Sequence, residues 1–192
     1  MPIEYEATFL NINKEVMREK LKSVGAYLIR SEFLQKRIVF KLPTGHEITG
    51  GWLRVRDEGD KIIMSLKIVD GDKIEDQKET CLTVSDFGSA VSFLEAIGCE
   101  RKAYQESTRE LWDLNGVEVT IDEWPFLEPY VEVEAKTEED VVVASQLLGF
   151  DYSQALFCSV DTIYSLKYNI APDVINNKTS EIVFGMPNPF VK

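Results

Sequence analysis

The chain has 192 residues, of which 44% are hydrophobic and 28% charged, as in an ordinary soluble globular protein with a real core. Its net charge of −12 argues against a nucleic-acid binder or a protein that docks on anionic membranes. It lacks a long apolar run and a recognisable secretory signal, so we expect a cytoplasmic protein. Cys81, Cys99 and Cys158 are too widely spaced for a metal motif and are expected to be buried free thiols.

Alternating and helical apolar patterns predict eight strands and four helices. The strands are expected at about residues 2–10, 33–42, 50–57, 61–69, 76–84, 103–113, 115–123 and 129–136. The helices are expected near 13–24, 86–97, 138–148 and 153–167. Asn13 and Thr137 are predicted to cap two of these helices, and Gly25, Gly98 and Gly149 to end three of them.

The same order of elements occurs twice. A strand, a helix and three strands fill residues 2–69, and the order repeats over residues 76–136. The sequence Leu-Asn-Gly at 114–116 predicts a hairpin within the second half. We infer an internal duplication within one domain, 1–192, with a strand core at about 2–136 and a helical cover at about 137–192.

Several strands carry like charges two residues apart, which places them on one face. These pairs are Glu4 with Glu6, Arg54 with Arg56, and Glu132 with Glu134. A solvated sheet face would explain each strand taken alone. Together, paired like charges favour a site for a divalent cation and a polyanion, since carboxylates bind Mg²⁺ or Mn²⁺ and arginine matches phosphate oxygens. Eight strands are enough to close a barrel around such a site.

These residues resemble the CYTH family, the triphosphate tunnel metalloenzymes. The motif of the family begins with Glu-x-Glu-x-Lys, continues through Leu-Arg-x-Arg and ends with Glu-x-Glu. The matching segments run in order over residues 3–135 and are "EYEAT", "LRVR", Lys67 in "MSLKIV", Glu79 in "QKETCLTV", Arg109 in "ESTRELW", Asp122 in "VTIDEWP" and "VEVEA". The sequence departs from the motif at Thr8, where the family has lysine.

The resemblance implies an α+β fold with an eight-stranded antiparallel β-barrel, a tunnel with flanking helices. It implies a Mg²⁺ or Mn²⁺ site at Glu4, Glu6, Glu132 and Glu134, with catalytic assistance from Glu79 and Asp122. It implies phosphate binding by Arg54, Arg56, Lys67 and Arg109, to which Arg37 and Lys102 are added as further candidates.

The implied function is metal-dependent hydrolysis of inorganic triphosphate, thiamine triphosphate or a nucleoside triphosphate. A class IV adenylyl cyclase, which converts ATP to cyclic AMP and pyrophosphate, is the alternative. A non-catalytic polyphosphate-binding protein is a third, favoured by Thr8. The expected partner is a small-molecule triphosphate, not nucleic acid or membrane. The C-terminal segment is expected either to close one end of the tunnel or to pack against a second subunit in a homodimer.

Overall fold

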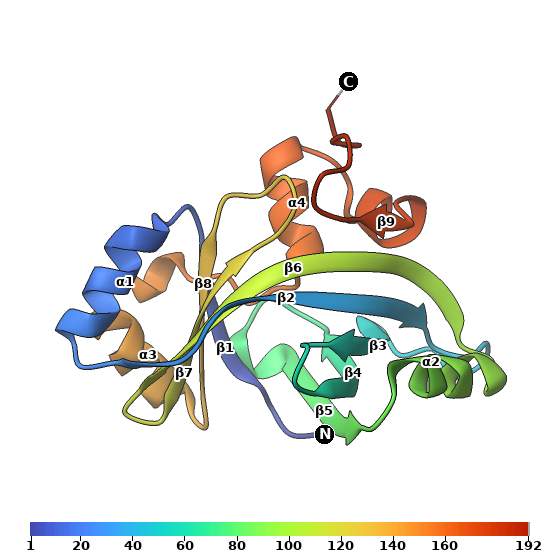
Figure 1. Ribbon diagram of the computed structural model, residues 1–192, viewed down its shortest axis with the longest axis horizontal. Helices are drawn as coiled ribbons and strands as arrows, with labels where there is room; N and C mark the ends of the chain where they lie inside the picture. The colour runs from blue at the N-terminus through green and yellow to red at the C-terminus, as the bar shows by residue number, and fades with distance from the viewer. Residues whose placement is uncertain (192) are drawn as a thin grey trace.

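An antiparallel sheet of eight strands curls around a hollow in the computed structural model, which describes residues 1–191 (Figure 1). The strands are β1 (Tyr5–Phe9), β2 (Tyr27–Lys41), β3 (Gly51–Asp57), β4 (Ile62–Val69), β5 (Gln77–Val84), β6 (Glu100–Leu114), β7 (Val117–Glu123) and β8 (Tyr130–Ala135). A short strand, β9 (Glu181–Ile182), pairs in parallel with β6. The predicted α+β fold with eight antiparallel strands is confirmed.

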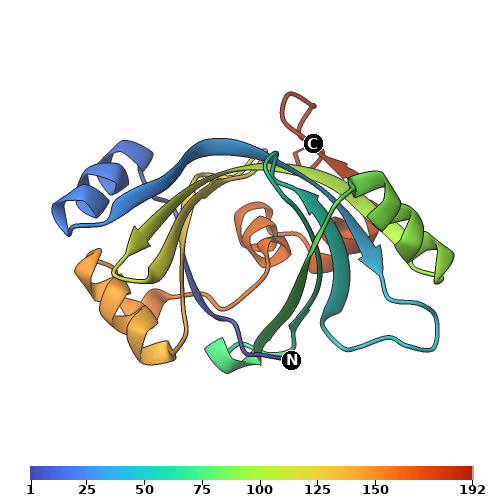
Figure 2. The same cartoon turned by 60° about the horizontal axis from the view of Figure 1, so that its bottom comes forward.

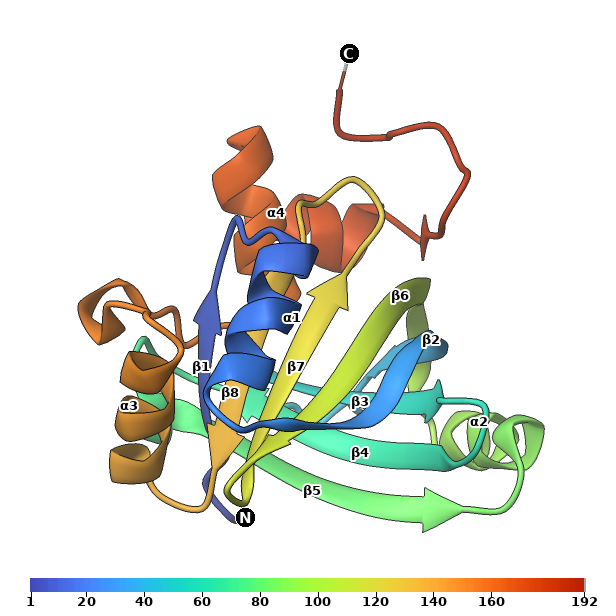
Figure 3. The same cartoon turned by 60° about the vertical axis from the view of Figure 1, so that its left-hand side comes forward.

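The strand order supports the internal duplication. The order is β1-β8-β7-β6-β2-β3-β4-β5, with β2 and β6 at the centre. If β1, β2, β3 and β4 are exchanged in turn with β5, β6, β7 and β8, the strand order becomes its own reverse. Figure 3 shows β1, β7 and β8 crossing the direction of β3, β4 and β5. The duplication inferred from the order of elements is therefore also a symmetry of the sheet.

The sheet is a half-barrel, because its two edge strands meet at one end only. Ile3 forms a bridge with Lys78, and the Glu4 N–H donates to the Gln77 carbonyl at 2.9 Å. Both edges continue beyond this contact without pairing with each other. The expected closed tunnel is thus open along part of its length.

Four helices follow the predicted pattern, and three lie outside the curl. They are α1 (Lys14–Ser23), α2 (Phe87–Ala96), α3 (Glu138–Leu147) and α4 (Val160–Tyr168). Figure 2 shows α4, in orange, on the concave side of the sheet. Asn13 and Thr137 cap α1 and α3 as predicted, and Asp86 caps α2. None of the helices within residues 1–191 is long and apolar enough to cross a membrane.

Two apolar cores lie between the sheet and the outer helices, and a third packs against α4. Phe9 on β1 belongs to one buried cluster with Leu21 of α1 and Val141 of α3. Phe40 on β2 belongs to a second with Val91 of α2. Because successive strand residues alternate between faces, burying these apolar residues on the outside directs the charged residues inward.

The hairpin between β6 and β7 forms at the predicted Asn115 and Gly116. Both residues have positive φ, 56° and 87°. A two-residue turn with this geometry matches the twist of the flanking strands, and asparagine followed by glycine adopts it at low cost. The sequence signal for this turn is therefore confirmed.

The fourth predicted helix, 153–167, is wrong at its start. Residues Tyr152–Gln154 form a short 3₁₀ turn, η2, and α4 begins only at Val160. Between them Leu156 pairs with Thr8, which donates to the Leu156 carbonyl at 2.9 Å and accepts from the Leu156 N–H at 3.0 Å. Because the backbone N–H and carbonyl of Leu156 are hydrogen-bonded to β1, they are not available for a helix.

The remaining C-terminal part contains η3 (Val174–Lys178), one turn of π-helix, followed by β9. Strands β2 and β6 each have 15 residues and are longer than predicted. The prediction lacked the start of β2 and both ends of β6. The expectation of three buried thiols is wrong for Cys81, which is exposed, and for Cys158, which is half-buried. Both side chains face the hollow of the sheet, where polar neighbours replace an apolar core.

Candidate functional site

The hollow of the half-barrel holds a cavity of about 680 Å³, a size that accommodates an organic ligand. Although the chain has a net charge of −12, six basic side chains line it, namely Arg37, Arg54, Arg56, Lys67, Lys102 and Arg109. The acidic side chains in its wall are Glu4, Glu6, Glu79, Glu118, Glu132, Glu134 and Asp161. Eleven of the twelve predicted site residues therefore face one cavity, and Asp122 is the exception.

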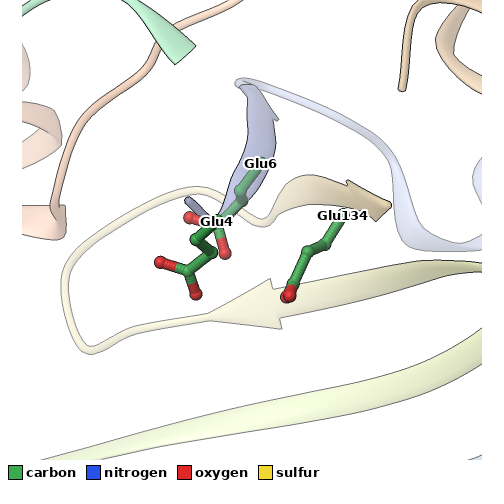
Figure 4. Close-up of side chains that lie close together, drawn as sticks. All are labelled: Glu4, Glu6 and Glu134. Carbon is green, nitrogen blue, oxygen red and sulfur yellow. The ribbon is translucent and has the colours of Figure 1, made fainter. Parts of the chain in front are cut away.

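Three of the predicted carboxylates form one compact group. Glu4 precedes β1, Glu6 lies on β1, and Glu134 is the cross-strand partner of Glu6 on β8. Figure 4 shows the three side chains converging. One oxygen from each lies within 4.8 Å of the others, and hard carboxylate oxygens of this kind fit Mg²⁺ or Mn²⁺. Glu132, predicted for the same set, lies outside the group.

Lys67 on β4 reaches across the seam of the half-barrel to this acidic group. Its Nζ lies 2.7 Å from Glu4 Oε2 and 3.4 Å from Glu6 Oε1, and the side chain is 7% exposed. Burial lowers the pKa of Lys67, but Glu6 and Glu4 outweigh it and keep the ammonium charged. Thr8, where the family motif has lysine, is buried and does not line the cavity. A neighbouring strand thus brings positive charge to the acidic group.

The strand next to β4, β3, carries Arg54 and Arg56. Arg54 donates to Ser65 Oγ at 3.1 Å and to Glu79 Oε1 at 2.9 Å. Arg56 lies 2.7 Å from a carboxylate oxygen of Glu58. Burial, followed by the charges of Arg54 and Arg109, lowers the pKa of Arg56 to about 10. Because Arg54 donates to Glu79, this predicted catalytic residue holds Arg54 in place.

Arg37 of β2 is a buried cation that has no carboxylate partner within residues 1–191. It is 5% exposed, donates to Gln35 Oε1 at 2.8 Å and to Ser107 Oγ, and lies 4.3 Å from the ring centre of Trp124. The Nε of Arg37 has no hydrogen-bond acceptor within residues 1–191. Burial, and then the charges of Arg56 and Arg54, lower the pKa of Arg37. An anion in the cavity would offset the free-energy cost of burying this unpaired positive charge.

Arg109 of β6 completes the basic wall and is fixed by two carboxylates. Its Nε and Nη2 donate to the two oxygens of Asp122 at 2.8 and 2.7 Å, and Nη2 also contacts Glu132. Thr120 donates a further hydrogen bond to Asp122 at 2.8 Å. Asp122 is 1% exposed and lies behind Arg109, so it orients the guanidinium without facing the cavity itself.

Some cavity residues were not predicted as site residues. Glu118 and Tyr130 lie on the same sheet face as the predicted Glu132, and the alternation of the strands would have found both. Asp161 and Asn176 come from the C-terminal segment, where no periodic pattern marks them. Asn176 accepts a hydrogen bond from Lys102 at 3.5 Å, so this segment forms part of the cavity wall.

Two carboxyl groups of the acidic group hold protons more tightly than free carboxyl groups do. Burial is the main cause for both, and it raises the pKa of Glu4 from its ordinary 4.5 to about 8 and that of Glu134 to about 7. The charges of Glu6 and Glu79 act in the same direction on Glu4, and Lys67 opposes them. Between pH 5 and 8 the folded protein therefore retains protons that the unfolded chain has released.

This difference predicts that stability falls as pH rises from 5 to 8. Since the folded state binds more protons in this range, each retained proton lowers the unfolding free energy by about 1.4 kcal/mol per pH unit. Near pH 6 the folded state keeps nearly both protons, so the expected slope is about 2 kcal/mol per pH unit. Urea unfolding in a metal chelator measures it, and Glu134→Gln should flatten it. A slope that is zero or of opposite sign would contradict the proton retention.

The comparisons with known proteins agree with this architecture. The profile of the CYTH domain matches residues 3–155. A search of the curated proteins found no significant match. The PH1819 protein of Pyrococcus horikoshii has 19% identity and a TM-score of 0.66, covering 85% of this chain and 99% of its own.

Two further solved structures have the same fold. A Vibrio parahaemolyticus protein assigned by name to the adenylate cyclases has 16% identity and a TM-score of 0.73, over 85% of this chain and 98% of its own. HpAC1 of Hippeastrum, described as having a dominant triphosphatase activity, has 12% identity and a TM-score of 0.56, over 88% of this chain and 97% of its own. These identities establish the fold alone, whereas the profile match spans most of the chain. The chain therefore belongs to the CYTH domain family.

Proposed function

We propose that this chain hydrolyses a triphosphate compound in its charged cavity with the help of Mg²⁺ or Mn²⁺. The observation that carries the proposal is the burial of Arg37 among Arg54, Arg56 and Arg109 without a carboxylate of its own within residues 1–191. Burying like charges together is costly unless a polyanion compensates them. Guanidinium groups suit phosphate oxygens, which they can bind with two hydrogen bonds.

In this proposal the basic and the acidic side chains of the cavity have separate roles. The four arginines, with Lys67 and Lys102, hold the phosphates. Glu4, Glu6 and Glu134 hold the metal, which when bound neutralises phosphate charge and orients a water molecule. Phosphoryl transfer needs such positioning and charge compensation more than a nucleophilic side chain.

The remaining predicted residues act on the arginines. Glu79 holds Arg54, and Asp122 holds Arg109 with two hydrogen bonds. We therefore assign Glu79 and Asp122 to positioning rather than to proton transfer. Glu132, which contacts Arg109 and not the three clustered carboxylates, has the same role in this scheme.

A second candidate function is cyclisation of ATP to cyclic AMP. It is supported by the cavity volume of about 680 Å³, which leaves room for a nucleoside beside the phosphates, and by the name of the Vibrio parahaemolyticus structure. In that reaction the ribose 3′-hydroxyl would attack the α-phosphate and pyrophosphate would leave. The description of HpAC1, whose dominant activity is that of a triphosphatase, favours hydrolysis.

One assay separates these functions. The full chain is incubated with tripolyphosphate, thiamine triphosphate or ATP, each with Mg²⁺, Mn²⁺ or a chelator, and phosphate, pyrophosphate and cyclic AMP are measured. Metal-dependent phosphate release supports the triphosphatase, and cyclic AMP with equal pyrophosphate supports the cyclase. Tight binding of tripolyphosphate without any product identifies a binding protein. Absence of both binding and turnover overturns the proposal.

A further inference from the structure

Tyr130 places a hydroxyl group in the cavity that no protein group uses. It opens β8 and faces inward with Glu132 and Glu134, two and four residues further along the strand. The residue is 2% exposed and lines the cavity, and its hydroxyl is neither hydrogen-bonded to a side chain within residues 1–191 nor among the fully buried atoms that lack a partner. Buried tyrosine hydroxyls ordinarily find a partner, so this one is available to a ligand.

Two acidic and two basic side chains surround Tyr130. The charges that act on it belong to Glu132, Asp122, Arg109 and Arg37. Both carboxylates are already engaged by Arg109 at 2.5 to 2.8 Å, and the two arginines are donors only. Burial, reinforced by Glu132 and Asp122, raises the pKa of Tyr130, so the hydroxyl stays protonated and can donate.

This corner of the cavity presents three hydrogen-bond donors beside the Glu132 carboxylate. They are the hydroxyl of Tyr130, the unpartnered Nε of Arg37 and the guanidinium of Arg109. A group that satisfies all three must carry several acceptor oxygens and negative charge, as a phosphoryl group does. Arg37 is restrained here by stacking on Trp124, which also lines the cavity.

We propose that Tyr130 contacts the substrate and donates its hydroxyl hydrogen bond to a phosphate oxygen held between Arg37 and Arg109. The inference rests on the proposed binding of a triphosphate and adds a neutral donor to the basic groups. It makes Tyr130 a binding residue, whose loss weakens affinity without weakening the fold.

The test compares two tyrosine-to-phenylalanine variants. Tyr164 is the matched control, since it is fully buried but donates its hydroxyl to the Pro125 carbonyl at 2.6 Å and does not line the cavity. Calorimetric titration with tripolyphosphate in a chelator, where turnover is suppressed, should show Tyr130→Phe binding about tenfold more weakly, as for a lost hydrogen bond to a charged group. Tyr164→Phe should bind within about twofold of the wild type.

Unfolding in urea should show the reverse order. Tyr130→Phe should keep the midpoint, because it removes a hydroxyl that faces the cavity and bonds to no side chain within residues 1–191. Tyr164→Phe should lower the midpoint, because the Pro125 carbonyl loses its donor. Unchanged affinity of Tyr130→Phe, or a lower midpoint for it, overturns the role of Tyr130. If the wild type itself binds no tripolyphosphate, the proposed function fails instead.

Discussion

Replacing Glu134 by glutamine is expected to lower kcat/KM for tripolyphosphate by about 100-fold or more, as for the loss of one strong electrostatic group in an active site. Glu134 belongs to the three clustered carboxylates, but it has no ion pair or hydrogen bond of its own within residues 1–191. The change therefore removes a proposed metal ligand and breaks no protein contact. Steady-state kinetics and calorimetric titration with Mn²⁺ measure the two effects.

Glu118→Gln is the matched control for this prediction. Glu118 is the cross-strand neighbour of Glu134 on β7 and also lines the cavity, but it lies outside the three-carboxylate group. It should retain kcat/KM within about threefold. Because burial and the charges of Glu6 and Glu118 raise the pKa of Glu134, the neutral Glu134→Gln variant should be more stable than the wild type in a chelator at pH 8, where the wild type buries an ionised carboxylate. Equal losses of activity in both variants would contradict the assigned metal site.

Replacing Lys67 by methionine is expected to destabilise the metal-free protein by about 3 kcal/mol, the range for removing one partner of a buried ion pair. At pH 9, where Glu4 is ionised, Glu4 and Glu6 would lose the ammonium that contacts both, and their repulsion would go uncompensated. A divalent cation bound by the same carboxylates would restore the balance. Urea unfolding of the variant should therefore show a large recovery of stability in Mn²⁺ relative to a chelator.

Lys22→Met provides the comparison for Lys67→Met. Lys22 pairs with Glu19 on the exposed surface of α1, where an ion pair contributes at most about 0.5 kcal/mol. The stability of Lys22→Met should be close to that of the wild type. Mn²⁺ should change the unfolding free energy of Lys22→Met and of the wild type by the same amount. If Lys67→Met were as unstable in Mn²⁺ as in a chelator, the acidic group would not be a cation site.

Strand alternation was sufficient to predict much of the site. The positions of Glu4, Glu6, Arg54 and Arg56 on inward faces follow from period two, once the apolar face is assigned to the core under the outer helices. The same rule extended back along β8 would have included Tyr130. These features depend on local pattern, which one sequence contains in full.

Pairings between distant segments were beyond reach. Glu132 and Glu134 look equivalent in sequence, but the register of β1 against β8 sets Glu134 opposite Glu6 and Glu132 opposite Thr8. That register joins strands about 125 residues apart, and no turn between adjacent strands fixes it. Likewise, α4 starts late because Leu156 pairs with the edge of β1, a contact that local helix signals do not contain.

The most direct test is a crystal structure of the full chain with Mn²⁺ and tripolyphosphate. Anomalous scattering should place Mn²⁺ on Glu4, Glu6 and Glu134, with the phosphates against Arg37 and the three other arginines of the basic wall. Lys67 should then contact phosphate oxygens instead of Glu4. Binding of tripolyphosphate on the outer surface, or Mn²⁺ away from the three carboxylates, would contradict the account.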